Sequence, residues 1–135
     1  FDPPQGSQTV AITYTGGGPN RSSANSVSYT NVGKMLTPVT SSGASTTASG
    51  TAWKMTTGGI YVGFMSANNA TASPGTSFSA YTKTQRSNQA GITSVSQPLV
   101  IGDTAGSTSD VTISATIGSS NWGTTIVPLI PTTYT

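Results

Sequence analysis

Residues 110–118, DVTISATIG, decide the fold class of this chain. Apolar side chains occupy every second position of this stretch, at Val111, Ile113, Ala115 and Ile117. Successive side chains of a β-strand point to opposite faces, so a period of two is typical of a strand with one buried face. The stretch therefore predicts a β-strand that packs against a hydrophobic core.

Similar stretches recur along the chain, separated by clusters of Gly, Pro, Asn and Ser, which favour turns. Further predicted strands cover residues 8–15, 26–32, 34–40, 51–57, 59–65, 77–83, 92–95, 98–101 and 124–130. Pro38 interrupts one of these stretches and indicates an edge strand, while Gly58 and Gly59 indicate a hairpin. Loops or turns are predicted at residues 41–50, 66–76, 84–91, 102–109 and 119–123.

No stretch has the periodicity of an ordinary helix, and turn signals recur about every 8–12 residues. The predicted architecture is an all-β, Ig-like or Greek-key β-sandwich of about seven to nine short strands. We predict this single domain over residues 16–135, after an N-terminal extension at residues 1–15. The predicted core consists of Val10, Ile12, Val27, Tyr29, Trp53, Met55, Ile60, Val62, Phe64, Phe78, Val111, Ile113, Ile117, Val127 and Leu129.

The chain has 135 residues, of which only 6% are charged, against about 25% in an average soluble domain. It contains no His, Cys or Glu, and its acidic residues are Asp2, Asp103 and Asp110. Five scattered Lys and Arg residues form no basic patch, which argues against nucleic-acid binding. No apolar run approaches the ~18 residues of a membrane span, which argues against membrane insertion.

The sequence GDTAG at residues 102–106 is similar to two catalytic motifs. Ala105 stands where aspartic proteases have Gly, and a nucleophile elbow needs a His base, which this chain lacks. Asp103 and Asp110 as a glycosidase pair or as ligands of a weak Ca²⁺ site have no further support in the sequence. We therefore predict no enzyme, no catalytic residue, no metal site and no cofactor.

Two features indicate contacts with glycans. Trp122 lies in a predicted turn and is expected to be exposed, where an aromatic ring can stack on a sugar. Asn20 and Asn69 begin the sequons Asn-Arg-Ser and Asn-Ala-Thr, which makes them candidate N-glycosylation sites. The exposed aromatic ring makes a secreted carbohydrate-binding or adhesin module that contacts host-surface glycans one alternative function, whereas the sequons concern glycans attached to the chain itself.

Residues 8–15, QTVAITYT, form a second alternating stretch, and the break at residues 16–19 separates it from the rest. Val10, Ile12 and Tyr14 share one face of this predicted strand. Such a strand either joins its own sheet or is donated to a neighbouring copy, where its main chain pairs and its alternate side chains fill the core. Repeated head to tail, that contact does not close, and it produces a filament.

This plan, a β-sandwich with a detached N-terminal strand, resembles donor-strand-exchanged filament subunits such as chaperone–usher pilins and archaeal thread proteins. Tyr134 is next to last, as in chaperone–usher pilins, and Gly123 lies beside the position of their typical glycine. Pro128, Pro131 and the absence of a disulfide depart from that family. The start at Phe1 and the Ser/Thr/Asn-rich composition favour secretion.

The resemblance implies a subunit of a pilus, fimbria or thread on the cell surface, a glycosylated homopolymer whose partner is the chain itself. A viral capsid or spike β-domain is a second alternative, because a β-sandwich does not by itself determine function.

Overall fold

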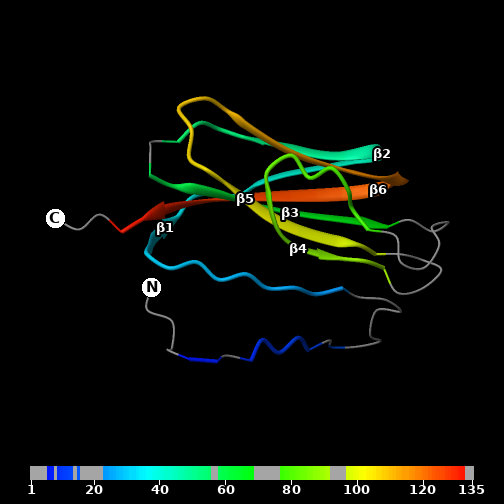
Figure 1. Ribbon diagram of the computed structural model, residues 1–135, viewed down its shortest axis with the longest axis horizontal. Coiled ribbons are helices and arrows are strands. Elements are labelled where there is room, and N and C mark those ends of the chain that lie inside the picture. Colours follow the sequence, from blue (N-terminus) through cyan, green and yellow to red (C-terminus); the bar gives the residue numbers. More distant parts are fainter. Residues whose placement is uncertain are drawn as a thin grey trace.

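The computed structural model describes residues 6–7, 9–13, 15, 23–55, 58–68, 77–91 and 97–132. Within these ranges the protein is all-β, as predicted: six strands form one antiparallel sheet and no helix occurs (Figure 1). The strands are β1 (Val32–Met35), β2 (Val39–Ala52), β3 (Ile60–Asn68), β4 (Thr84–Gln89), β5 (Leu99–Ala105) and β6 (Val111–Pro131). Their order is β1-β6-β3-β5-β4, and β2 also pairs with β6. None of the described ranges contains a helix long and apolar enough to cross a membrane.

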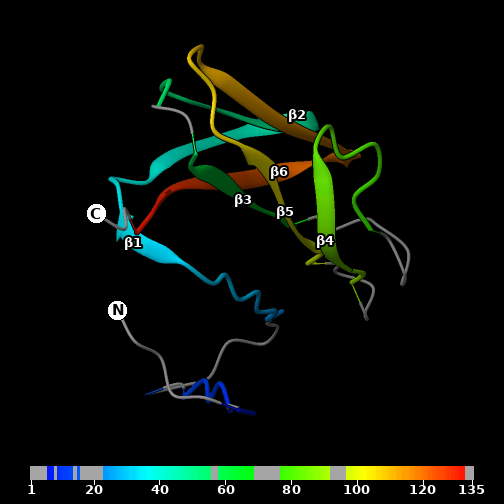
Figure 2. The same cartoon turned by 60° about the vertical axis from the view of Figure 1, so that its left-hand side comes forward.

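Strand β6 organises the sheet, because its 21 residues pair with β1, β2 and β3 (Figure 2). β1 and β2 follow each other along one side of β6, and β3 occupies the other side. The sequence predicted two strands here with a turn at residues 119–123, and that turn is wrong. Residues 120–123 stay in the sheet because partners flank them: Trp122 lies opposite Gly43 of β2 and Ala67 of β3.

β6 bends at its middle instead of ending there. Its pairing with β2 shifts between Thr47↔Thr116 and Ser45↔Ser120, so residues 117–119 face a single residue of β2. Extra residues in one strand bend it and increase its local twist. The two halves of β6 therefore run in different directions, and β2 follows the same bend.

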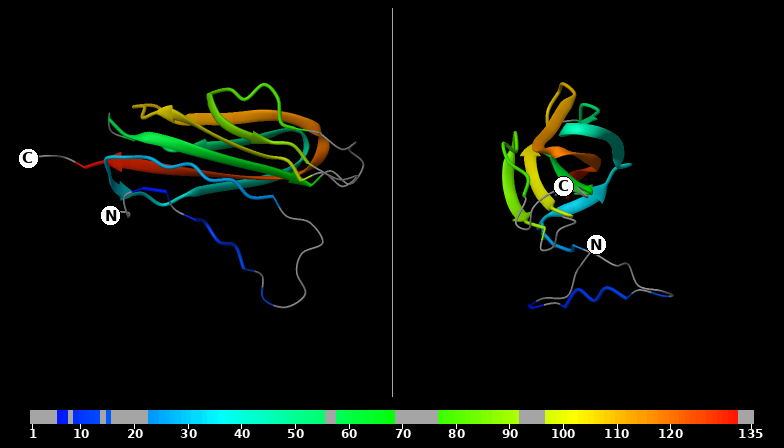
Figure 3. Two further views of the ribbon diagram at one scale, coloured as in Figure 1. Left: turned by 60° about the horizontal axis from the view of Figure 1, so that its bottom comes forward. Right: turned by 90° about the vertical axis from the view of Figure 1, so that its right-hand side faces the viewer.

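The first half of β6 has a further neighbour, the segment that precedes β4. Ser79 exchanges two main-chain hydrogen bonds of 2.8 Å with Thr116, and the Thr82 amide donates to the Ser114 carbonyl at 2.9 Å. Since β4 then pairs with β5, the sheet curls around its own inner face, as Figure 3 shows end-on. All six strands are hydrogen-bonded into one sheet, so the two separate sheets of a sandwich stay a prediction.

The core lies inside this curl. Its buried members are Ala48, Ala52, Met55, Tyr61, Met65, Ala67, Phe78, Val100, Val111, Ile113, Ala115, Ile117 and Ile126. The predicted core residues Met55, Phe78, Val111, Ile113 and Ile117 are thus confirmed, and Val62 is buried as predicted. Trp53 is wrong: it is 76% exposed, because β2 ends at Ala52 and the alternation does not continue to it.

Most of β2 consists of residues 41–50, which the sequence predicted to be a flexible loop. This run of Ser, Thr, Ala and Gly lacks the alternation of apolar and polar residues that would predict a strand. Its inward residues Ala48, Gly50 and Ala52 are small but buried, and β6 supplies hydrogen-bond partners along the run. β2 therefore forms because it pairs with the apolar strand β6 and because Thr favours strands.

Other predictions of loops and of a hairpin are also wrong. The predicted loop 84–91 contains β4, and the predicted turn at 102–109 begins inside β5. Gly58 and Gly59 form no hairpin, because β2 and β3 lie on opposite sides of β6. In the predicted strand 77–83, Ser79 makes only an isolated bridge. The predicted strand 92–95 lies outside the described residues.

Two prolines coincide with the gap between β1 and β2. Pro38 precedes β2, which confirms the predicted interruption at that residue. Across the gap, the Leu36 amide donates to the Pro128 carbonyl at 2.9 Å, so the main-chain polar groups of Pro128 face the gap. A proline tolerates this position in a strand because no ladder bond needs the N–H that it lacks.

Gly102 should not tolerate a side chain. It lies opposite Gly63, and the Tyr81 ring packs over this pair, with its hydroxyl donating to the Gly63 carbonyl at 3.1 Å. A Cβ on Gly102 would overlap that ring and lie 2.5 Å from the Thr84 carbonyl oxygen. Gly102→Ala is expected to lower the free energy of unfolding by about 1–3 kcal/mol, measured by urea denaturation.

Gly123→Ala is the matched control, because no atom lies within 4 Å of a Cβ added there. Its expected effect is within about 0.5 kcal/mol. Equal destabilisation by both substitutions would contradict the packing described for Tyr81.

Candidate functional site

The side of the sheet that faces away from the core, called the outer face, is also apolar. Opposed residues of antiparallel strands share a face, and the pairs Val62↔Val127 and Phe64↔Ile101 lie on the outer one. Val62 and Ile101 are 2% and 1% exposed. The continuous apolar runs of β3 and of the second half of β6, unlike the alternation of its first half, are typical of strands covered on both faces.

An extended segment, residues 23–31, lies across the outer face (Figure 1) and is called the strap. Val27 and Tyr29 are half-buried, whereas Ser26 and Ser28 are exposed. The predicted alternation is therefore present, but the predicted strand 26–32 is wrong before residue 32, where β1 begins. Of the predicted core residues, Val27 and Tyr29 belong to the cover of the outer face instead.

Side chains attach most of the strap to the sheet. The Ser23 hydroxyl donates to the Gln97 carbonyl at 2.5 Å, the Asn25 amide side chain donates to the Ser87 hydroxyl, and the Asn31 carbonyl accepts from the Thr132 amide at 3.0 Å. Asn31 has a φ of 60°, a left-handed conformation that Asn tolerates better than most residues. No main-chain to main-chain hydrogen bond joins residues 23–30 to another described residue, although the Ser26 amide donates to the Asn25 side chain at 2.9 Å.

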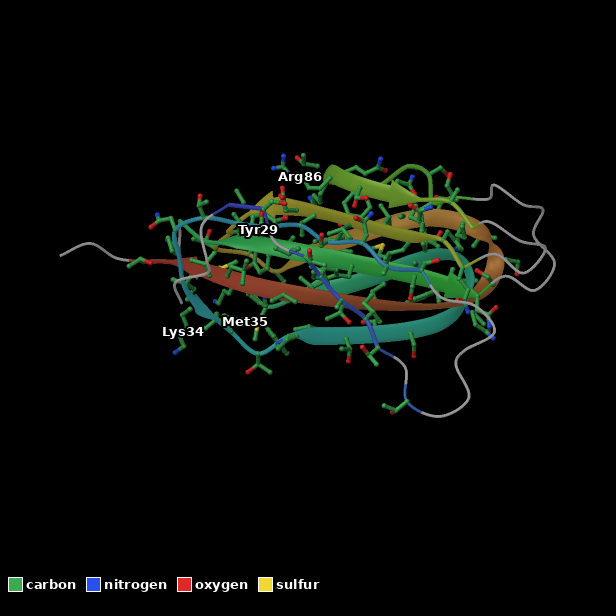
Figure 4. The ribbon with its side chains drawn as sticks, turned by 90° about the horizontal axis from the view of Figure 1, so that it is seen from below. Tyr29, Lys34, Met35 and Arg86 are labelled. Atoms are coloured by element: carbon green, nitrogen blue, oxygen red, sulfur yellow. The ribbon has the colours of Figure 1, made fainter. Side chains whose placement is uncertain are left out.

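The one charged attachment of the strap among the described residues is a three-residue cluster, Tyr29, Arg86 and Asp103, called the clasp. Figure 4 labels Tyr29 and Arg86. Arg86 donates from Nε to Asp103 Oδ2 at 2.7 Å and from a terminal guanidinium nitrogen to Oδ1 at 2.9 Å. Tyr29 donates its hydroxyl proton to Oδ2 at 2.7 Å. A register shift between Gln85 and Ser87 in β4 brackets Arg86, and a bulge of this kind re-aims a side chain.

The clasp joins an ion pair to a hydrogen-bonded phenol. Asp103 is only 5% exposed, yet the hydrogen bonds from Arg86 lower its pKa against the opposing effect of burial, and the Tyr29 hydroxyl lowers it further. Burial, followed by the bond to Asp103, raises the pKa of Tyr29. At neutral pH the carboxylate is charged and the phenol is protonated, and the two groups are hydrogen-bonded to each other within the clasp.

Asp103 and Asp110, the two acids considered as a catalytic or Ca²⁺ pair, bind different partners in the structure. Asp103 lies within the clasp, whereas Asp110 is exposed before β6 and accepts a hydrogen bond of 2.9 Å from the Lys54 amide. Across the described residues, no three His, Cys, Asp or Glu side chains gather into a group that could hold a metal ion.

Beside the strap, part of the outer face is incompletely covered. Ile60, Phe64, Val127 and Leu129 are half-buried, although all four were predicted as core. At one end of this apolar strip lies a hollow of about 320 Å³, whose lining includes Phe64, Ser66, Leu99, Gly123 and Thr125. The outer face therefore offers both apolar surface and room for a further side chain.

The N-terminal segment lies on the same side of the molecule, beyond the strap (Figures 1 and 3). Val10 is 70% exposed and Ile12 is 54% exposed, and the described residues of this segment form no strand. The prediction of Val10 and Ile12 as core residues is wrong, because their segment does not pair with the sheet and both side chains are exposed. Tyr14, the third predicted residue of the donated strand, lies outside the described residues.

The structure exchanges the predicted roles of the two tryptophans. Trp122, predicted as exposed in a turn, lies half-buried within β6, where its indole donates to the Ser45 hydroxyl at 3.0 Å. Trp53, predicted as core, is exposed at the rim of a hollow of about 240 Å³ with Leu36, Val39 and Pro128 in its lining. The sequons at Asn20 and Asn69 lie outside the described residues.

The chain matches no protein-family description, no curated protein and no solved structure.

Asp103→Asn should release the strap. Loss of the charge and of its bidentate partner is expected to lower the free energy of unfolding at pH 7 by about 1–3 kcal/mol, and Tyr29→Phe by about 0.5–1.5 kcal/mol. Because the folded-state pKa of Asp103 is depressed, its contribution is present above the unfolded value of about 3.9 and is lost as pH falls through the folded value.

The difference in stability between the natural protein and Asp103→Asn should therefore shrink below about pH 4. Urea denaturation at a series of pH values measures it, and Asp110→Asn, which removes an exposed acid, is the control. A difference that stays constant down to pH 2 would show that the Asp103 charge does not hold the strap.

Proposed function

We propose that the protein is a structural subunit of an extracellular surface filament, in which each chain donates its N-terminal strand to the next. One observation carries this proposal. Val10 and Ile12 alternate on an exposed extended segment, while the outer face of the same protein keeps apolar side chains that are only half-buried. An exposed apolar extended segment and an incompletely covered apolar face in one chain complement each other.

Burial of apolar side chains would favour such a contact. Burial of an aliphatic side chain contributes about 1.5–3 kcal/mol relative to its exposure, so Val10 and Ile12 together contribute several kcal/mol for each contact. Main-chain hydrogen bonds to the acceptor add to this. Because donor and acceptor are different surfaces, the contact is heterologous and continues from copy to copy without closing.

The acceptor that we propose is the apolar strip beside the strap. The strap lies over β5, as its bonds from Tyr29 to Asp103 and from Ser23 to Gln97 indicate. It leaves the strip along β3 and the second half of β6, which includes Phe64 and Val127, incompletely covered. A donated strand on this strip would lie next to the strap, whose main-chain groups can pair with it.

The same contact would complete the predicted fold. The strap and a donated strand together would form a second small sheet over the outer face. The six-stranded sheet and this second layer would then make an Ig-like or Greek-key β-sandwich, in which residues 1–15 act as a separate extension. The fold and the assembly are therefore one proposal with one test.

The composition suits a polymer outside the cell. With charged residues at 6% of the chain, neighbouring copies meet with little charge repulsion. We propose that the partner of the chain is itself, at the cell surface, and that Asn20 and Asn69 are its glycosylation sites.

Ile12→Asp should prevent polymerisation, because it places a charge on the side of the donated strand that enters the apolar strip. Negative-stain microscopy and size-exclusion chromatography of the full chain measure the outcome: fibres for the natural sequence and small species for the variant. Thr13→Asp is the matched control, since residue 13 points to the opposite side of the strand, and it should still form fibres.

A version that lacks residues 1–15 should stay small and gain stability when a peptide of residues 1–15 is added. If the natural chain is a monomer at high concentration, or if Ile12→Asp still forms fibres, the N-terminal strand is not donated.

A secreted carbohydrate-binding module is the second candidate function, and exposed Trp53 favours it. The indole rims an apolar hollow with Lys54 and Thr37 beside it, and a sugar is recognised by stacking on an aromatic ring with polar groups at its edge. The residue that would carry this function is Trp53 and not Trp122.

If the protein binds glycans, Trp53→Ala should weaken binding by at least about tenfold, the effect of losing a central aromatic contact. A glycan array identifies the ligand, and quenching of Trp fluorescence gives the affinity. Trp122→Phe, within β6, is the control and should bind normally. An array without hits, or equal affinity after Trp53→Ala, removes this candidate.

A further inference from the structure

The strap has a defined direction and register over the outer face. Two of its hydrogen bonds, from Ser23 and from Tyr29, each join the strap to a residue 74 positions further along the chain. Because the offset is the same at both bonds, the strap runs parallel to β5. Val27, which lies between the two bonds, is therefore at the level of Ile101.

The N-terminal segment runs in the opposite direction to the strap. Figures 1 and 3 show its described residues (dark blue) beyond the strap and antiparallel to it. Residues 16–22, GGGPNRS, connect the two and are rich in residues that favour turns. The entropy cost of closing a connection rises only slowly with its length. The chain can therefore lay this segment along its own strap as an antiparallel pair.

The alternation of the two segments selects one register. Val27 and Tyr29 of the strap are half-buried against the sheet, whereas their immediate neighbours are exposed. Opposed residues of an antiparallel pair share a face, so Val10 and Ile12 reach the sheet only when they oppose odd-numbered strap residues. With Ile12 opposite Val27 and Val10 opposite Tyr29, both apolar residues of one segment lie beside both of the other.

This register places Ile12 at the hollow of the outer face. Ile101, at the level of Val27, lies opposite Phe64 of β3 in the sheet, and Phe64 lies opposite Thr125 of β6. Phe64 and Thr125 both line the hollow of about 320 Å³. Beside Val27, the Ile12 side chain therefore has both room and apolar surface beneath it.

We propose that in the free subunit the N-terminal segment closes on its own strap in this register, and that this internal cover must open before the segment is donated. The second part rests on the proposed filament, whereas the closure does not. The structure holds the open arrangement, in which Val10 and Ile12 are exposed and residues 23–30 form no main-chain pair with described residues. Closure buries both side chains and pairs the strap.

The closure would regulate assembly, because a covered outer face cannot accept the segment of a neighbour. A short tether holds a segment near its own site at an effective concentration in the millimolar range. A neighbouring copy therefore replaces the internal segment only where subunits are concentrated, and the exchange is a domain swap.

Hydrogen exchange of the strap, followed by mass spectrometry, measures the closure. At about 1 μM, with the monomer confirmed by light scattering, the amides of residues 24–30 that point toward the segment should exchange at least about tenfold more slowly in the full chain than in Ile12→Asp. Thr13→Asp is the matched control and should keep the protection, since residue 13 points away from the sheet. Both residues are exposed, so neither substitution disturbs the sheet. Equal exchange in all three proteins would overturn the closure.

A disulfide tests the register, in a chain that contains no cysteine of its own. The register places Thr13 opposite Ser26, and opposed Cα atoms lie about 4.5–5.5 Å apart, within the range of a disulfide. Thr13→Cys combined with Ser26→Cys should form an internal disulfide in the dilute monomer, resolved on a non-reducing gel. Thr13→Cys combined with Thr30→Cys, which is out of register, should not. Equal cross-linking of the two double variants would overturn the register.

The outcomes separate the closure from the filament. The oxidised double variant of Thr13 and Ser26 should form no fibres until a reductant is added, and fibres before reduction would show that closure does not block donation. A protected strap and an internal disulfide, without fibres of the natural chain at any concentration, would support the closure and refute the filament. Fibres of a chain whose strap exchanges freely in the dilute monomer would refute the closure and leave strand donation intact.

Discussion

The structure depends on β6, a single strand of 21 residues that bonds to β1, β2, β3 and the segment around Ser79. Its two halves have different sequence patterns and different surroundings. The half from Val111 alternates and is buried on one face, as expected of a strand that covers a core on one side. The half that ends at Pro131 is apolar on both faces, and this forces the protein to cover the outer face of its own sheet.

The cover that the protein provides is held by side chains. Apart from Asn31, the strap contributes hydroxyl, amide and phenol groups to its attachment, with the clasp of Tyr29, Arg86 and Asp103 at its centre. A segment held this way keeps its main-chain groups available for another strand. The clasp therefore does more than stabilise the subunit: it fixes an extended chain on the outer face, next to the strip where a further strand can bury its apolar side chains. Asp103 is charged at neutral pH, so the clasp is at full strength there.

The sequence predicts those elements whose hydrophobic pattern is local. The alternation after residue 110, the apolar runs at β3 and β5, and the interruption at Pro38 all appear in the structure. β2 and β4 escape prediction because polar residues form them, and only their pairing with distant apolar strands makes them strands. The clasp escapes for a related reason, since its residues are separated by up to 74 positions and meet only when the sheet forms. The predicted burial of Trp53 and exposure of Trp122 are both wrong, because β2 ends before Trp53 and β6 continues through Trp122.

The same scarcity of charge suits the proposed assembly. Lys and Glu usually protect the edges and faces of β-proteins from one another, and here Ser, Thr, Gly and Ala take their place, while Arg86 and Asp103 are used in the clasp. In the proposed filament the donated strand and the outer face would be two different surfaces, so their contact would continue from copy to copy without closing.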